Sequence, residues 1–240
     1  MAIHFEITGK HIKNIVKAIE NINEECVWTF DSSGLLVRMS DVYKYKMLQI
    51  HFTKEDFISY TCDSPEDFGI IIERIKDVSK TLRTKDTLIM TYEDGEDYIS
   101  ISSAGLTKKI KLIDTKLIGR VPHLNVDFDY SVAVPSRPIL SFLKSCGKAI
   151  SFNCITKSGG LSMVCENDEG ISSVEWSEED INLNPLNYES DTNYAVSEVM
   201  MATSTMTNAV KVQGSKKGVI SFTWGLAENS TATAMVAHRE

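Results

Sequence analysis

The chain has 240 residues, of which 42% are hydrophobic and 24% charged, and its formal net charge is −8 at pH 7. This composition is typical of one or two folded domains and excludes a low-complexity or disordered chain. No run of 18 apolar residues occurs, so no membrane-spanning helix and no membrane partner are expected.

The first half of the chain is predicted to contain two helices, each followed by paired strands. Apolar residues recur every three or four positions over residues 8–22, with Thr8 as the expected N-cap, and again over residues 70–82. Alternating apolar and polar residues on either side of turn residues predict the strands. The predicted strands of this half cover residues 26–30, 35–39, 46–52, 87–92, 98–102 and 107–113.

The second half repeats this plan. Helices are predicted over residues 136–146 and 195–207, and the segment KSGGLSMVC resembles DSSGLLVRM of the first half. Similar segments at corresponding places indicate an internal repeat. The predicted strands of this half cover residues 150–155, 161–165, 171–177, 209–213 and 218–224.

Between the halves, residues 114–130 show no helix or strand period and contain Gly119 and Pro122. We interpret this stretch as a linker between domains. The sequence therefore predicts an α+β fold of two similar domains, residues 1–114 and 131–240, joined by a connecting loop over residues 115–130.

Basic residues are concentrated on the polar face of three of the four predicted helices, although the protein is acidic overall. A helix that buries one face against a sheet leaves the other face free to meet a partner. The fourth helix has Ser197, Met201 and Ser204 where cations are expected, and Lys211 in the next strand is the nearest substitute. The cations of the other three helices are Lys10, Lys13, Lys17, Lys76, Lys80, Arg83, Arg137, Lys144 and Lys148.

Two interpretations of these helix faces stay open. Lysines are common on solvated helix surfaces, and Glu20, Glu73 and Asp77 weaken the positive field on these helices. If the helices instead line one surface, their charge would attract the phosphate backbone of double-stranded DNA without reading its sequence.

The order and spacing of several segments resemble the proliferating cell nuclear antigen (PCNA) family of DNA sliding clamps, of the archaeal and eukaryotic type. These segments are WTFDSSGLLVRMSDVYKYKMLQIHF, DFISYTCDSP followed by a helix and DTLIMTYED, and SVAVPSRPILSFLKSCGKAISFNC. The resemblance covers essentially the whole chain. It implies a DNA-clamp fold in which helices lie on one face of antiparallel sheets. It also implies a trimeric ring whose channel is lined by the basic helices.

The resemblance further implies a function. The ring would be a DNA polymerase processivity factor that encircles duplex DNA, is opened by a clamp loader, and tethers DNA polymerase and other replication and repair proteins. It would have no catalytic residue, no metal and no cofactor. Subunits would join through one edge strand of each domain. The interface positions carried over are Lys109, Ile110, Lys111, Leu112, Ser173, Val174, Glu175 and Trp176.

The same resemblance implies a docking site for partner proteins. A short peptide with hydrophobic and aromatic anchors would bind in a pocket beneath the linker. The pocket positions carried over are Met39, Tyr45, Met47, Val121, Leu124, Met235, Val236 and Ala237. The chain departs from the family at its end, where His238 stands in place of the usual proline of an LAP-K pattern, and this puts the choice of partners in doubt.

Other functions stay open at this point. The chain could be a subunit of a heterotrimer, a checkpoint-type clamp subunit or a clamp-like factor that works as a monomer. A metal-dependent DNA-processing enzyme is disfavoured, because the five histidines lack metal-ligand spacing and no phosphate-binding or nucleophile motif is present. The start has no signal-peptide pattern and the five cysteines are scattered, which favours an intracellular protein, in the cytoplasm of an archaeon or the nucleus of a eukaryote.

Overall fold

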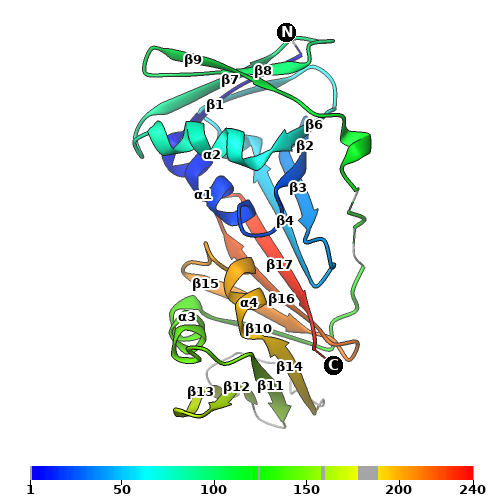
Figure 1. The fold of residues 1–240 in the computed structure, drawn as a ribbon, viewed down its shortest axis with the longest axis vertical. Helices are drawn as coiled ribbons and strands as arrows, with labels where there is room; N and C mark the ends of the chain where they lie inside the picture. Colours follow the sequence, from blue (N-terminus) through cyan, green and yellow to red (C-terminus); the bar gives the residue numbers. More distant parts are fainter. Residues whose placement is uncertain (1, 120, 124, 158–159, 178–188, 240) are drawn as a thin grey trace. The chain divides into compact units, whose positions relative to one another are not determined.

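The computed structural model of the chain describes residues 2–119, 121–123, 125–157, 160–177 and 189–239. Two compact units account for the chain (Figure 1). The first comprises Met1–Val42, Leu48–Pro122 and Leu226–Ala232, and the second comprises Tyr43–Met47, His123–Gly225 and Thr233–Glu240. Each unit is thus completed by a short segment from the other half of the chain. The domain boundaries expected near residues 114 and 131 stay a prediction.

The first unit packs two helices with two groups of antiparallel strands. Helices α1 (Gly9–Ile19) and α2 (Ile72–Thr81) lie against each other. One sheet has the strand order β5-β1-β7-β8-β9, and the other group has the order β4-β3-β2-β6. The strands are β1 (Ile3–Thr8), β2 (Glu25–Asp31), β3 (Gly34–Ser40), β4 (Lys46–Thr53), β5 (Ser59–Cys62), β6 (Glu66–Ile71), β7 (Thr87–Tyr92), β8 (Tyr98–Ser103) and β9 (Leu106–Lys111). Short 3-10 turns cover Lys54–Asp56 and Thr115–Leu117.

Buried aromatic rings hold the two strand groups of the first unit together. Phe5 of β1 stacks on Phe30 of β2 with ring centroids 5.5 Å apart, and Phe68 of β6 meets Tyr92 of β7 at 4.6 Å. Such pairs stabilise a core beyond the area that they bury. At the start of α1 the Thr8 hydroxyl accepts a hydrogen bond from His11 N at 3.3 Å, so the predicted N-cap is confirmed.

The second unit has the same components. Helices α3 (Ser136–Ser145) and α4 (Val196–Ala202) accompany strand groups of order β13-β12-β11-β14 and β10-β15-β16-β17. The strands are β10 (Tyr130–Pro135), β11 (Ser151–Lys157), β12 (Gly160–Asn167), β13 (Gly170–Ser177), β14 (Ser190–Ala195), β15 (Ala209–Gly214), β16 (Val219–Gly225) and β17 (Thr231–Ala237). Phe142 of α3 meets Phe152 of β11, whose ring in turn contacts Tyr194 of β14.

The strand pairings of one unit recur in the other. In the first unit β1 pairs with β7, and β2 pairs with β3 and β6. In the second unit β10 pairs with β15, and β11 pairs with β12 and β14. The predicted α+β fold of two similar halves is therefore confirmed. None of the helices in the described ranges has the length and apolarity needed to cross a membrane.

All four helices are shorter than predicted, and the fourth is shortened most. The fourth helix, predicted over residues 195–207, ends at Ala202 because Thr203 leaves the helical conformation. The Thr203 hydroxyl donates to Val199 O at 2.7 Å, and the polar run that follows has low helix propensity.

Candidate functional sites

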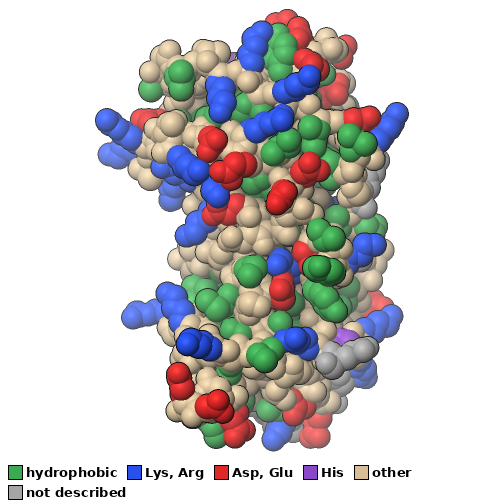
Figure 2. All heavy atoms as spheres, in the orientation of Figure 1, with side chains coloured by type: hydrophobic (Ala, Val, Ile, Leu, Met, Phe, Trp, Pro, Cys, Tyr) green, Lys and Arg blue, Asp and Glu red, His purple; other side chains and the backbone are tan. Residues whose placement is uncertain are grey.

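The cations of α1 lie on the side of the helix opposite its buried residues. Lys10 and Lys17 are exposed and Lys13 is half-buried, whereas Ile12 and Ile15 are buried in the core. This placement follows from the helical spacing of the isoleucines, which turns the lysines outward. In Figure 2 blue side chains project from this part of the first unit.

The cations of α2 are compensated by nearby carboxylates. Lys76 Nζ lies 3.3 Å from a carboxylate oxygen of Glu20 and 3.4 Å from one of Glu73. Lys80 Nζ lies 3.1 Å from Asp77 and 3.4 Å from Glu73. Hydrogen bonds to Glu20 and Glu73 raise the pKa of Lys76, and a hydrogen bond to Asp77 raises that of Lys80. These lysines are charged, but their local field is reduced.

Two of the cations assigned to helix faces lie beyond the helix ends. Helix α2 ends at Thr81 and is capped by Leu82, so Arg83 is in the loop that follows. Helix α3 ends at Ser145, and Gly147, with φ of 58°, turns the chain before Lys148. Arg83 and Lys148 are both exposed, but the assignment to helix faces is corrected for both.

In the second unit, the helix cations are Arg137 in the first turn of α3 and Lys144 in its last turn, and both are exposed. No carboxylate of the described ranges forms an ion pair with either. Lys211 lies on β15 between Val210 and Val212, which are both buried, so its side chain points away from the core face of the strand.

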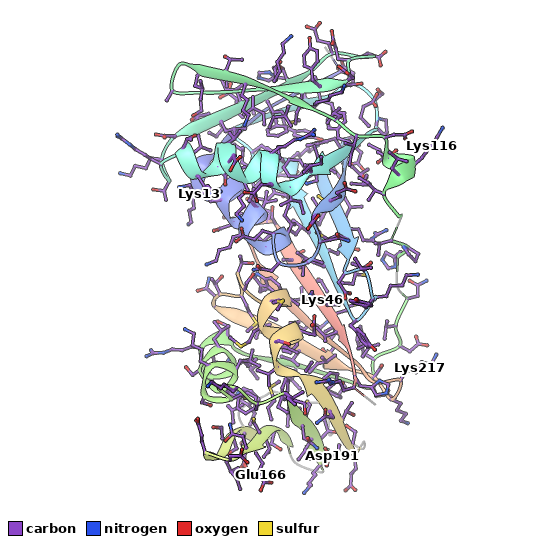
Figure 3. All side chains as sticks on the ribbon, in the orientation of Figure 1. Lys13, Lys46, Lys116, Glu166, Asp191 and Lys217 are labelled. Atoms are coloured by element: carbon purple, nitrogen blue, oxygen red, sulfur yellow. The ribbon has the colours of Figure 1, made fainter. Side chains whose placement is uncertain are left out.

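Helix α4 carries methionines and one compensated acid in place of cations. Met200 and Met201 are 41% and 40% exposed. Glu198 accepts a hydrogen bond from the buried Lys46 (labelled in Figure 3), with Nζ and Oε2 2.6 Å apart. The Lys46 Nζ also lies 3.4 Å from Met201 Sδ. No residue of α4 (Val196–Ala202) is a cation, and Ser204 lies beyond the end of the helix.

The predicted interface segments lie on strands at the edges of their sheets. Strand β9 is the last strand in the order β5-β1-β7-β8-β9, and β13 is the first in the order β13-β12-β11-β14. Lys109, Lys111 and Glu175 are exposed, whereas Ile110 and Trp176 are buried. Leu112 lies just beyond β9, where its N–H donates to Asp97 O.

The remaining interface positions, Ser173 and Val174, lie on β13, exposed and half-buried respectively. The amides and carbonyls on the outer sides of β9 and β13 pair with no strand of the described chain. Both strands therefore present a sheet edge that is available for pairing, and β5 and β14 end the same two sheets on the other side.

The positions predicted for the docking pocket fall into both units. In the first unit Met39 is 2% exposed and lies on the core face of β3, so its side chain offers no docking surface, whereas Val121 is half-buried. Leu124 lies outside the described residues. In the second unit Tyr45 is 53% exposed, and its carbonyl accepts a hydrogen bond from Ala237 N at 2.8 Å. This bond brings two of the predicted positions together.

The other docking positions of the second unit are Met47, Met235 and Val236. Met47 and Val236 are buried, and Met235 is half-buried. Their contribution to a surface is therefore smaller than that of Tyr45.

The first unit has a cavity of about 150 Å³ that the sequence did not indicate. Val121 and Gly119 border it from the linker, and side chains on the outer face of β2, β3 and β6 complete it. These are Val27, Thr29, Leu36, Arg38 and Asp67. Arg38 Nε donates to Gln49 Oε1 at 2.9 Å, and Thr29 Oγ1 donates to Asp67 Oδ1 at 2.6 Å. Along β2 and β3, residues such as Thr29 and Arg38 alternate with the apolar residues of the core. This alternation is the sequence signal for the outer strand face that lines the cavity.

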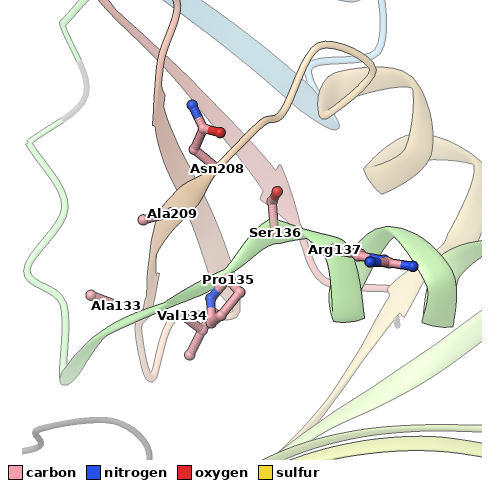
Figure 4. A pocket seen from close by; sticks show the side chains of 7 residues that line it. All are labelled: Ala133, Val134, Pro135, Ser136, Arg137, Asn208 and Ala209. Carbon is pink, nitrogen blue, oxygen red and sulfur yellow. The ribbon is translucent and has the colours of Figure 1, made fainter.

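A second cavity, of about 500 Å³, lies in the second unit where β10 leads into α3 (Figure 4). Its lining is small and mostly apolar, and Arg137 points away from the other labelled side chains. The lining residues are Ala133, Val134, Pro135, Ser136, Arg137, Asn208 and Ala209. They provide no nucleophile with an adjacent base.

The described residues hold no group of three or more His, Cys, Asp or Glu side chains that could bind a metal ion. The five cysteines are free thiols. Burial raises the pKa of Cys26 to about 12 and that of Cys154 to about 11, which keeps both protonated. A protonated, buried thiol is a poor nucleophile.

Residues 4–128, just over half of the chain, match the family model described as proliferating cell nuclear antigen, N-terminal domain. The chain belongs to the proliferating cell nuclear antigen family. The matched residues of this PCNA-family chain contain most of the first unit, including helices α1 and α2, but not its segment Leu226–Ala232.

Three similar curated relatives come from archaea. The DNA polymerase sliding clamp of Archaeoglobus fulgidus is 29% identical over 118 residues, which span 49% of this chain and 48% of the relative. The DNA polymerase sliding clamp of Picrophilus torridus is 25% identical over 52% of this chain and 51% of the relative. The chain thus spans about half the length of these two relatives. For DNA polymerase sliding clamp 1 of Thermococcus kodakarensis, the identity is 24% over 78% of this chain and 76% of the relative.

Solved PCNA structures share the fold over almost the whole chain. A chain of the structure of the C-terminal region of FEN-1 bound to A. fulgidus PCNA superposes with a TM-score of 0.92 at 18% identity, covering 99% of this chain and 98% of that one. A chain of the PCNA2–PCNA3 complex of Sulfolobus tokodaii gives a TM-score of 0.84 at 19% identity, covering 98% and 99%. At these identities the likeness establishes the fold.

Proposed function

We propose that the chain is one subunit of a ring-shaped sliding clamp, a DNA polymerase processivity factor that encircles duplex DNA and tethers replication and repair proteins. Membership of the PCNA family and relatives named DNA polymerase sliding clamp support this proposal. The protein would act as a scaffold and not as an enzyme. It would work inside the cell, where its five free thiols stay reduced.

The observation that carries the proposal is the pair of open sheet edges, one in each unit. In the internal repeat, β4 of the first unit corresponds to β13 of the second, and β17 of the second corresponds to β9 of the first. Strands β4 and β17 are each bordered by the short segment that their unit receives from the other half of the chain. In the first unit Thr53 N donates to Ser230 Oγ, and in the second Ala237 N donates to Tyr45 O. Strands β9 and β13 have no such neighbour in the described chain. Pairing β9 of one subunit with β13 of the next would cover both edges.

The two edges also carry opposite charge. On β9, Lys109 and Lys111 are exposed on one face, and Lys109 is held by Tyr98, whose hydroxyl lies 2.6 Å from Nζ. On β13, Glu175 is exposed. Opposite charges across a strand pair stabilise it, and unlike edges join head to tail, an arrangement that closes into a ring when the rotation between successive copies permits it.

The helix cations supply the contact with DNA in this proposal. Exposed cations on α1 and α3 would attract phosphates without reading sequence, and the contacts would exchange rapidly. Retention on DNA would come from enclosure, so weak contacts permit sliding. The carboxylates around Lys76 and Lys80 weaken the contacts further.

Partner proteins would bind near the linker through a short peptide. The archaeal PCNA of one structure with the same fold is bound to the C-terminal region of FEN-1, which supports a peptide partner here as well. Exposed Tyr45, beside Ala237 in the second unit, provides apolar surface for it. DNA polymerase and a clamp loader are the partners that the proposal requires.

Retention on closed DNA tests the proposal. The chain is loaded on a nicked circular plasmid with a clamp loader, washed in high salt to remove electrostatic binding, and measured before and after the plasmid is linearised. A clamp stays on the circle and is lost from the linear DNA. Equal loss from both forms would contradict it.

One alternative keeps the clamp but changes its composition. A chain of the Sulfolobus tokodaii PCNA2–PCNA3 complex has the same fold, so a ring of different subunits is a second candidate. In that case the purified chain would not close a ring alone, and mixing it with related subunits from the same cell would restore retention.

A further inference from the structure

Three segments of the second unit meet around Tyr45 and are fixed by backbone hydrogen bonds. Ala237 N donates to Tyr45 O at 2.8 Å, His238 N donates to Gly218 O at 2.7 Å, and Arg239 N donates to Asn193 O at 2.8 Å. Gly218 has a φ of 77°, and a side chain there would collide with the His238 ring. The end of the chain is therefore held between the loop that contains Tyr45 and the turn that contains Gly218.

Each of these segments carries positive charge. The loop contributes Lys44, the turn between β15 and β16 contributes Lys216 and Lys217, and the chain end contributes Arg239, all of them exposed. We call these four residues the basic rim. Figure 3 labels Lys217 at the end of the β15–β16 turn, and Figure 2 shows blue side chains on the same flank of the unit.

In the described part of the chain a carboxylate compensates one cation of the basic rim. Asp129 accepts a hydrogen bond from Lys216 N at 2.6 Å, and its other oxygen lies 3.6 Å from Lys216 Nζ. No described carboxylate forms an ion pair with Lys44, Lys217 or Arg239. The rim is thus a local excess of positive charge on a chain whose net charge is −8. Such a patch attracts a negatively charged partner and repels a positive one.

Exposed aromatic surface borders the basic rim. Tyr43 is 80% exposed and Tyr45 53%, and the bond from Ala237 to Tyr45 places the second of these rings beside the chain end. Exposed tyrosines next to cations are a combination suited to peptides, because a ring contacts apolar anchors while the cations pair with carboxylates. A nucleic-acid surface would instead need cations that follow a strand of phosphates, and here they lie on three short segments around one aromatic loop.

We propose that the basic rim selects partner peptides in which acidic residues flank the apolar anchors. The inference rests on the proposed function, since it names the kind of partner segment that the clamp would recruit. The anchors would contact the apolar surface at Tyr45, and aspartate or glutamate side chains would lie beside Lys217 and Arg239. Charges at the edge of an interface chiefly set the association rate and the choice of partner.

Three synthetic peptides with the same aliphatic and aromatic anchors and with acidic, neutral or basic flanks provide the test. Fluorescence anisotropy with the full chain measures their affinity at low and moderate salt. The acidic peptide is expected to bind about tenfold more tightly than the basic one at low salt, the sum of several exposed ion pairs. This preference should shrink as salt is added.

Two variants identify the rim as the cause. In Lys217→Glu/Arg239→Glu the preference is expected to disappear or reverse, while the neutral peptide binds as before. Lys157→Glu, a charge reversal on β11 outside the rim, should keep the preference.

Equal affinity for the three peptides, or no binding of any of them, would overturn the inference. The inference would also be overturned if a short DNA duplex bound more tightly than the acidic peptide, displaced it, and lost affinity when Lys217 was replaced. Retention on circular DNA is measured separately, so failure of the inference can be distinguished from failure of the proposed clamp function.

Discussion

The two units share one pattern of strand pairing but place their charges differently. In the first unit carboxylates lie 3.1 to 3.4 Å from the lysines of α2, and the open edge β9 is basic. In the second unit α4 carries no cation, and the open edge β13 carries Glu175. Because buried side chains determine the pairing of strands, exposed positions change charge without changing the fold. The repeat has thereby acquired two unlike edges, which suit association of one copy with the next.

The largest effect is expected when the charge difference between the edges is removed. In Lys109→Glu/Lys111→Glu, like charges would face each other across the proposed β9–β13 pair. Self-association should weaken by about 30-fold, equivalent to about 2 kcal/mol. Analytical ultracentrifugation over a dilution series measures it.

The complementary change provides the control for this experiment. Adding Glu175→Lys to the same chain should restore part of the lost association, because opposite charges face each other again. Lys54→Glu, in the short turn after β4, should have no effect. Failure of Glu175→Lys to restore association would place the contact elsewhere.

A second comparison concerns how each unit holds the segment from the other half of the chain. In the first unit Asp56 accepts hydrogen bonds from Asn229 and Ser230. In the second, buried Lys46 pairs with Glu198 at 2.6 Å. Lys46→Ala should destabilise the protein by about 2 kcal/mol, reduced from the cost at a fully buried pair because Glu198 is partly exposed.

Urea unfolding monitored by tryptophan fluorescence checks this value. Lys46→Met/Glu198→Leu, which removes both charges and keeps apolar volume, should lie within about 1 kcal/mol of the parent chain. A loss equal to that of Lys46→Ala would show that packing and not the ion pair matters.

The helices allow a third comparison. Lys144 of α3 has no ion pair with a described carboxylate, whereas Lys80 of α2 has two carboxylates within 3.4 Å. Lys144→Gln should therefore weaken binding to a DNA duplex by about threefold and reduce the salt slope by about 1, and Lys80→Gln should do so less. Glu73→Gln/Asp77→Asn should strengthen binding. If Lys144→Gln and Lys80→Gln lost equal DNA affinity, the carboxylates near α2 would have no measurable effect on DNA binding.

The smallest expected effect is a pH dependence confined to the first unit. Burial lowers the pKa of His11 in the folded chain, and the negative charge of Asp56 offsets part of this decrease. As the pH falls, the His11 imidazole is therefore protonated in the unfolded chain before it is protonated in the folded chain. Stability should decrease slightly below about pH 6.5, the ordinary value, until the folded pKa is reached. In His11→Gln this decrease should be absent when the melting temperature is measured between neutral and mildly acidic pH. An unchanged profile would assign the titration to another group.

Apolar periodicity was sufficient to predict four helices and the α+β repeat, because the buried side chains repeat every three to four positions in helices and every two in strands. It missed β1, β5, β6, β10, β14 and β17. Strand β5 has four residues and β14 begins with polar ones, so neither offers a clear alternation. Helix ends were also misjudged, since the basic pattern continues past Thr81 and Ser145.

The candidate sites were less predictable than the fold. Leu35, Val37 and Met39 occupy every second position of β3 and are all buried. This alternation is visible in the sequence and predicts that Met39 lies in the core and not in a docking pocket. In contrast, the burial of Lys46 depends on Glu198, 152 positions further along the chain, and no local pattern predicts it. The basic rim likewise brings together residues from three distant segments.

The solution mass of the purified chain, measured by light scattering over a dilution series, tests the central proposal most directly. A self-closing ring predicts a mass near three times 26.8 kDa that persists on dilution and falls when salt screens the β9 and β13 charges. A mass of 26.8 kDa at every concentration, both alone and with related subunits from the same cell, would contradict the ring.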